Sequence, residues 1–199
     1  PPRSTLFPYT TLFRSEMVKW IGLFERNLER DGVALFYYAG HGMQIDGVNY
    51  MVPIEADPGS EVEAKGMMVS VDLVLGAMSE KGKSLNLVIL DACRNNPFKR
   101  SWSARGDGSK GLAQMMAPSG SLIAYATAPG EEAEDGKGRN GVYTGCLLKH
   151  IQEPNLDIAM MFRKVREDVE KETSHLKKPQ TPWESSSIKG QFCFYPVPK

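Results

Sequence analysis

Two short apolar runs place the strongest limit on what this chain can fold into. Residues 33–39 are apolar at every position, and residues 85–90 are apolar at all but one. Strands that are apolar on both faces belong inside a sheet that helices cover on both sides, as in parallel sheets. A helical pattern separates the two runs, so we expect a right-handed parallel crossover between them. The sequence therefore predicts an α/β domain with a mostly parallel sheet flanked by helices.

Further elements are predicted around these runs. Residues 46–47 (Asp-Gly) have the composition of a two-residue hairpin turn, and Ser70 can cap a helix. Residues 121–127 and the tail 192–195 are predicted strands, and residues 142–151 a helix. Three other helices should bury one apolar face each. Their expected core positions are Met17, Trp20, Ile21, Phe24 and Leu28; Val71, Val74, Leu75 and Met78; and Ile158, Met161, Phe162, Val165 and Val169.

The composition indicates one globular domain and excludes two classes of partner. The chain has 199 residues, with 24 Lys and Arg against 24 Asp and Glu, so its formal net charge is zero. No charge excess favours nucleic acid or an anionic membrane surface. The longest strictly apolar run is far shorter than the ~18–20 residues of a membrane span. We therefore expect neither a nucleic-acid nor a membrane partner for this segment.

The first fifteen residues are predicted to lie outside the fold. Residues 5–15 (Thr-Leu-Phe-Pro-Tyr-Thr-Thr-Leu-Phe-Arg-Ser) resemble the translation of a widely used sequencing adapter. A segment of that origin carries no fold information. We expect residues 1–15 to be an artefact and the domain to span residues 16–199, beginning partway through its natural fold. The compartment is accordingly not predicted.

A histidine and a cysteine stand at the predicted ends of two strands. His41 follows the first apolar run. Cys93 follows the second run and lies 52 residues after His41. Ligands of open α/β sheets lie at the carboxyl ends of the strands. A thiolate attacks carbonyl carbon, and a neighbouring imidazole can remove the thiol proton. The pair therefore suggests a thiol enzyme.

Three motifs together resemble a known family. Residues 37–42 (Tyr-Tyr-Ala-Gly-His-Gly), 90–98 (Leu-Asp-Ala-Cys-Arg-Asn-Asn-Pro-Phe) and 124–130 (Ala-Tyr-Ala-Thr-Ala-Pro-Gly) look like motifs of the caspase-like cysteine peptidases. They are most similar to the bacterial metacaspase-like, or orthocaspase, branch. The resemblance implies a three-layer caspase-like fold that lacks its first strand or strands. It also implies a part with His and Cys at 16–98, a linker at 99–119 and a small-subunit-like part at 120–199.

The resemblance assigns a role to each motif residue. Cys93 would be the nucleophile, and His41 the base and later the acid. Backbone N–H groups of Gly42 and Cys93 would form the oxyanion hole, whose donors are worth about 3–4 kcal/mol of barrier lowering. Tyr125 and Ala126 would lie in a substrate-binding strand. A peptide or protein is the expected substrate, and a monomer is favoured over a dimer.

Acidic residues suggest cleavage after Arg or Lys. Asp91 stands two residues before Cys93, and the loop after residue 130 contributes Glu132 among other acids. A pocket lined by carboxylates would favour a basic side chain before the cut. The alternatives are a capped strand end for Asp91 and a solvated loop charge for Glu132. We expect an endopeptidase that uses a Cys-His pair, with an inactive caspase-like scaffold or a different thiol enzyme as competing interpretations.

The linker and the cofactor requirement stay open. Self-cleavage after Arg100, Arg105 or Lys110 would match the expected specificity, and a plain flexible loop is the alternative. Nothing in the sequence requires a cofactor. Calcium activation is implied by the resemblance, although no Asp- or Asn-rich loop has a calcium-binding spacing.

Other residues that often carry chemistry are expected to be structural. Cys146 and Cys193 should be unreactive. His150 and His175 are predicted surface residues. Trp183 is predicted either to border the cleft or to pack in the core.

Overall fold

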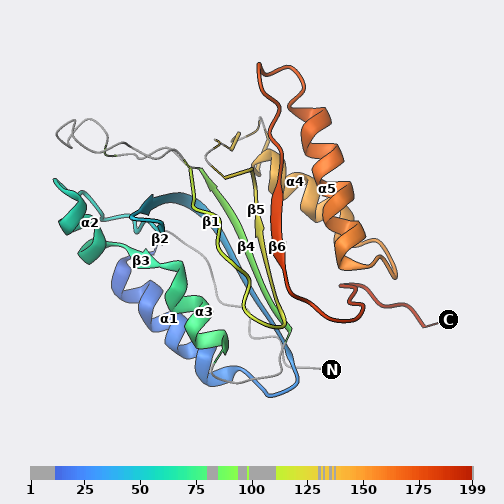
Figure 1. The fold of residues 1–199 in the computed structure, drawn as a ribbon, viewed down its shortest axis with the longest axis horizontal. Coiled ribbons are helices and arrows are strands. Elements are labelled where there is room, and N and C mark those ends of the chain that lie inside the picture. The colour runs from blue at the N-terminus through green and yellow to red at the C-terminus, as the bar shows by residue number, and fades with distance from the viewer. Residues whose placement is uncertain are drawn as a thin grey trace.

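The fold is built on one mixed six-stranded sheet (Figure 1). A computed structural model describes residues 12–79, 85–93, 98, 111–129, 131, 133–134, 136 and 138–198, with the backbone alone for Cys93. The strand order is β3-β2-β1-β4-β5-β6. Its centre is parallel and comprises β1 (Val33–Ile45), β4 (Leu85–Cys93) and β5 (Ser121–Tyr125). The antiparallel strands are β2 (Val48–Met51), β3 (Val69–Ser70) and β6 (Trp183–Ser186).

Helices cover both faces of the sheet and complete three layers. Figure 1 shows α1 (Arg14–Asn27) and α3 (Val71–Ser79) on one side of the sheet and α4 (Val142–His150) and α5 (Ile158–Glu172) on the other. The first pair packs on Val88 and Leu90 of β4, and the second on Leu87 and Ile89. This alternation confirms the prediction that β4 is buried on both faces. A short helix, α2 (Glu61–Met67), is capped by the Ser60 hydroxyl.

β1 is longer than predicted and continues through the histidine motif. The prediction ended this strand at Ala39, before Gly40. The Asp46-Gly47 turn, with positive φ at both residues, folds β2 back onto the end of β1 and pairs Gly42 with Met51. The hairpin prediction is confirmed. Its pairing keeps the chain extended across glycines that would weaken an isolated strand.

One face of β1 is open, in contrast to the prediction. Val33, Leu35 and Tyr37 are 54%, 42% and 43% exposed, whereas Ala34 between them is buried. The exposed residues lie on the side of α4 and α5, but those helices pack over β4 and β5. Within the described residues, β1 also has no strand partner along residues 33–40 on the side away from β4. This part of β1 is therefore an exposed apolar edge.

Two predicted boundaries differ from the structure. α1 begins at Arg14, and Leu12 packs on the core, so residues 12–15 are part of the described fold, contrary to the prediction. No helix breaker separates them from Met17, and the helix extends through them. The origin of the segment remains a prediction. The tail 192–195 is not a strand, because β6 occupies the place beside β5 and the tail instead bonds the start of α5.

No helix among the described residues is long and apolar enough to span a bilayer.

Candidate active site

The register of β1 and β4 brings the two predicted catalytic positions together. His41 pairs with Cys93 across these parallel strands, and Ala39 pairs with Asp91. Neighbouring strands lie about 4.8 Å apart, so the two backbones are adjacent. Leu87 and Ile89 of β4 point to the α4/α5 side, and the alternation of a strand places Asp91 with them. The His41 side chain is exposed there.

The register also sets which way the two backbone N–H groups predicted to form the oxyanion hole point. The carbonyl of His41 accepts a hydrogen bond from Val52 N–H at 3.0 Å, so the backbone groups of Gly42 face β4. Leu85 N–H donates to the carbonyl of Gly32, the residue before β1, so Leu85 faces β1. Every second residue of β4 faces the same way, and Cys93 N–H therefore also faces β1. Both N–H groups therefore face the partner strand within the parallel ladder, where such groups donate to its carbonyls, and their predicted oxyanion-hole role stays a prediction.

Tyr38 holds the backbone of His41 in place. Its hydroxyl donates to the His41 carbonyl at 2.8 Å, and it is 3.4 Å from the Val52 carbonyl. Burial raises the pKa of Tyr38 to about 12, so the phenol stays a neutral donor at physiological pH. A Cβ at Gly40 would lie 2.8 Å from the Tyr38 hydroxyl. Glycine at position 40 is what lets Tyr38 reach His41, a role that the sequence analysis missed.

Gly42 leaves no room for a side chain. A Cβ there would lie 3.0 Å from Ala92 Cβ and 3.3 Å from Leu112 Cδ2. Ala92 is the residue between Asp91 and Cys93, and Leu112 belongs to the second half of the predicted linker. The absence of a side chain at position 42 therefore allows the two strands and that segment to pack closely beside the site.

A residue of α4 binds the Asp91 carboxylate. Thr144, in the first turn of α4, donates its hydroxyl hydrogen to Asp91 Oδ2, and Tyr37 of β1 lies 2.7 Å from the same Thr144 hydroxyl. Asp91 is partly buried. Thr144 is a second residue that the sequence did not indicate, because its partners are distant in the chain.

The remaining specificity predictions are placed unevenly. Tyr125 lies in the core on the α1/α3 face, and its hydroxyl accepts a hydrogen bond from Met115 N–H. Ala126 is also buried, and its carbonyl accepts from Gln180 Nε2. The structure thus does not bring the Tyr125 side chain together with Asp91, since it points to the other face. Glu132 lies outside the described residues.

Gln180 ties the acidic loop to the end of β5. This buried side chain donates to Ala126 O at 2.8 Å and accepts from Glu134 N–H at 2.9 Å. Its own N–H donates to the buried Thr173 hydroxyl at the end of α5. Glu131 in the same loop pairs with Lys178. These bonds anchor both sides of position 132.

The second half of the predicted linker contacts the rest of the fold. Asn49 of β2 exchanges two hydrogen bonds with the backbone of Ala113, at 2.8 and 2.7 Å, and Leu112 is buried. Leu112, Met115 and Ala117 therefore pack on the core although the prediction placed them in the linker, whereas Met116 is 91% exposed. The predicted self-cleavage residues Arg100, Arg105 and Lys110 lie outside the described residues.

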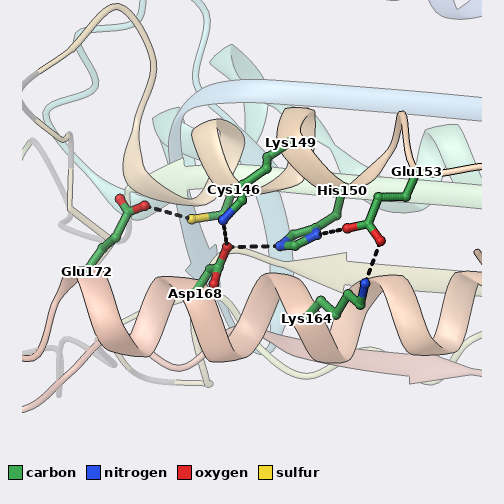
Figure 2. A network of polar contacts seen from close by, with 7 residues as sticks. All are labelled: Cys146, Lys149, His150, Glu153, Lys164, Asp168 and Glu172. Carbon is green, nitrogen blue, oxygen red and sulfur yellow. Dashed lines mark hydrogen bonds and ion pairs between the residues drawn. The ribbon is translucent and has the colours of Figure 1, made fainter.

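A polar network between α4 and α5 corrects the prediction for His150 (Figure 2). His150 is buried, with Nδ1 on Glu153 and Nε2 3.0 Å from Asp168. Lys164 pairs with Glu153, and Lys149 with Asp168. Asp168 and Lys164 lie on the facing helix α5, which is why position alone suggested a surface histidine. Cys146 is buried, and burial followed by the nearby Glu172 raises its thiol pKa to about 12, in line with the expected lack of reactivity.

The other flagged residues differ in their exposure. His175 is exposed, as predicted, and Cys193 is half-buried. Trp183 lies on β6 and is 40% exposed, so it is not a core residue. Within the described ranges no three His, Cys, Asp or Glu side chains could together hold a metal ion, so we assign no calcium ligands.

The protein is thus a three-layer α/β domain in which a histidine and a cysteine position adjoin at the ends of two parallel strands. The family model described as the caspase domain of the C14 peptidases matches residues 9–193. The chain therefore belongs to the caspase-domain family of cysteine peptidases.

Individual relatives agree with this assignment. The chain is 30% identical over 166 residues to mucosa-associated lymphoid tissue lymphoma translocation protein 1 homolog of Mus musculus, and 30% identical over 154 residues to the corresponding Homo sapiens protein. These alignments cover 82% and 76% of this chain but only 18% and 17% of the relatives, so the chain spans less than a fifth of their length. Both are animal proteins, and the narrower prediction of a bacterial orthocaspase stays a prediction.

A solved structure shares the fold. Caspase-1 from Spodoptera frugiperda superposes with a TM-score of 0.63 at 18% identity, covering 94% of this chain and 74% of that one. The similarity confirms the predicted three-layer caspase-like fold.

Proposed function

We propose that the domain is a cysteine endopeptidase that cleaves after Arg or Lys. The observation that carries the proposal is the pairing of His41 with Cys93 across β1 and β4, with Asp91 two residues earlier on β4. Membership of the caspase-domain family supports the peptidase class. The basic preference is supported by the carboxylate of Asp91 beside these positions.

The proposed reaction uses the chain's own groups. His41 removes the Cys93 thiol proton, and the thiolate attacks the carbonyl carbon of the scissile bond. The N–H groups of Gly42 and Cys93 stabilise the oxyanion. His41 then protonates the leaving amine, and water hydrolyses the acyl-enzyme. Asp91, together with Glu132, binds the guanidinium or ammonium group of the residue before the cut.

Electrophilic peptides test both the nucleophile and the specificity. We expect a peptidyl alkylating agent with Arg at the recognition position to label Cys93, and a matched Asp peptide not to. Peptide mapping by mass spectrometry should show that His41→Ala abolishes labelling, while Cys193→Ser leaves it intact. Labelling that ignores His41, or that favours the Asp peptide, would contradict the proposal.

Substitution of the pocket carboxylate tests the basic preference. Asp91→Asn should lower kcat/KM for Arg substrates at least about a hundredfold, as expected for removing one partner of a desolvated charge pair. Retained Arg turnover would reject the pocket.

Parallel assays with added calcium and with a chelator measure the calcium activation that family resemblance implies. A fragment that folds but never labels at Cys93 would favour the inactive-scaffold interpretation.

A further inference from the structure

Three elements meet at the hydroxyl of Thr144. Thr144 comes from the first turn of α4, Tyr37 from β1 and Asp91 from β4. Thr144 Oγ1 lies 2.7 Å from the Tyr37 hydroxyl and in hydrogen-bond contact with Asp91 Oδ2. Thr144 and Asp91 are 53 residues apart in the sequence, and Thr144 and Tyr37 are 107 apart. The contact is therefore a product of the tertiary fold.

The direction of these hydrogen bonds follows from donor counting. An ionised carboxylate only accepts, so the single hydroxyl hydrogen of Thr144 goes to Asp91. The Thr144 oxygen is then left as an acceptor, and the Tyr37 hydroxyl must donate to it. Burial and the nearby Asp91 charge raise the pKa of Tyr37, which keeps the phenol protonated as this direction requires. The three groups form one chain of donors that ends on the carboxylate.

The surroundings of Asp91 make this chain consequential. Thr144 is 9% exposed, so little water reaches its hydroxyl. The negative charge of Asp91 also reaches Tyr143, whose pKa is raised well above its ordinary value, first by complete burial and then by Asp91. α4 has no acidic residue in its first turn and no side-chain cap, so the Asp91 carboxylate also complements the positive end of the helix.

The geometry points to Thr144 as a positioning residue for substrate specificity, with Tyr37 acting through it. This inference rests on the proposed role of Asp91 in binding a basic side chain. The terminal torsion of an aspartate is broad, and the carboxylate plane is set by its hydrogen bonds. Recognition of a guanidinium depends on that plane, because the two parallel N–H groups need fixed acceptors. Thr144 fixes Oδ2 and thereby the plane in which Asp91 meets the substrate.

The test compares Arg substrates with citrulline substrates, which match Arg in shape but lack its charge. Thr144→Val removes the hydroxyl at nearly constant volume and should lower the Arg-to-citrulline ratio of kcat/KM about tenfold, as expected for losing a hydrogen bond to a charged group. The loss should be in the KM for Arg. Thr144→Ser retains a hydroxyl and should restore the ratio. Thr181→Val removes another Thr–carboxylate bond, to Glu170 at 2.9 Å, and serves as the matched control with an unchanged ratio.

A double-mutant cycle tests the order of the chain. Tyr37→Phe should lower the ratio a few-fold in the wild-type background and add nothing in Thr144→Val, because the tyrosine acts only through the threonine. Additive losses would overturn the relay. An unchanged ratio in folded Thr144→Val, with Asp91→Asn still impaired, would overturn the positioning role while leaving the proposed function intact. If the wild-type protein labels at Cys93 but does not distinguish Arg from citrulline, the Asp91 pocket and the positioning role both fail. If Cys93 is unreactive altogether, the proposed function itself fails.

Discussion

The glycines on the two sides of His41 have different roles. Gly40 makes room for the hydroxyl of Tyr38, which holds the His41 carbonyl, whereas Gly42 lies against Ala92 and Leu112. Neither has positive φ, so both are required for space rather than for backbone conformation. The motif therefore encodes close packing around the histidine as well as the histidine itself.

Gly42→Ala should destabilise the fold by about 1–3 kcal/mol, the usual cost of forcing a methyl group into a packed core. The new Cβ would meet Ala92 Cβ at 3.0 Å. The free energy of unfolding from urea titration measures the effect. Gly76→Ala is the matched control, because nothing lies within 4 Å of its Cβ in α3. It should stabilise the protein by about 0.5–1 kcal/mol through higher helix propensity. A Gly42→Ala variant as stable as the wild type would show that the core yields at this point.

Some residues of the site were predictable and others were not. His41 and Cys93 each follow an apolar strand run, so the topology of a parallel sheet brought them together in the prediction, and the register agrees. Thr144, Tyr38 and Gln180 carry no local signal, because their partners are set by tertiary packing across separate elements. His150 was misplaced for the same reason, since Asp168 lies on the opposing helix.

At the level of elements, the periodicity of apolar residues predicted burial correctly where a helix packs one face on the sheet. All five apolar positions predicted for α5 are buried, and Ser70 accepts from Asp72 N–H at the start of α3 as a cap would. The tail 192–195 failed because its alternating aromatic residues pack together and against the α5 region instead of the sheet. Local alternation cannot reveal that β6 already pairs with β5.

The contact between α4 and α5 should depend on pH. The pKa of Glu153 is lowered by Lys164 and then His150, and that of Asp168 by Lys149 and then His150, from ordinary values of 4.5 and 3.8. A carboxyl group whose pKa falls on folding stabilises the protein above its ordinary pKa, and this contribution is lost as the pH falls through the folded-state value. We therefore expect the free energy of unfolding to fall as the pH drops below about 4.5.

Removal of both carboxylates isolates this contribution. The double variant Glu153→Gln with Asp168→Asn should show a shallower loss of stability than wild type over the same acid range, measured by urea unfolding at several pH values. Glu167→Gln removes an exposed carboxylate elsewhere on α5 and should keep the wild-type slope. An identical slope in the double variant would mean that the network adds no stability that depends on pH.

For the whole molecule, the open side of β1 is the main liability. Val33, Leu35 and Tyr37 are exposed together, next to a strand edge that has no partner among the described residues. Such an edge can pair with a strand of another copy. The sequence favoured a monomer, whereas this open edge offers a surface for association with a second copy of the chain.

Sedimentation velocity across a range of concentrations measures that association. We expect wild-type protein to self-associate, and Val33→Lys with Leu35→Lys to reduce association, because charges on an edge strand oppose pairing. Val62→Lys, at an isolated α2 residue that is 81% exposed, is the control and should behave like wild type. Equal association of both variants would place the contact elsewhere.

The two hydrogen bonds between Asn49 and Ala113 matter if this chain is cleaved between Phe98 and Gly111. β5 lies against β4, Ala113 is bound to β2, and Leu112 is inserted beneath β1 and β4, so the two pieces share a single interior. Neither piece could leave without exposing that interior to water. A cut made there by an added protease should give two bands under denaturing conditions, while the elution volume of the native particle stays the same. The severed protein would behave as a heterodimer produced from one gene.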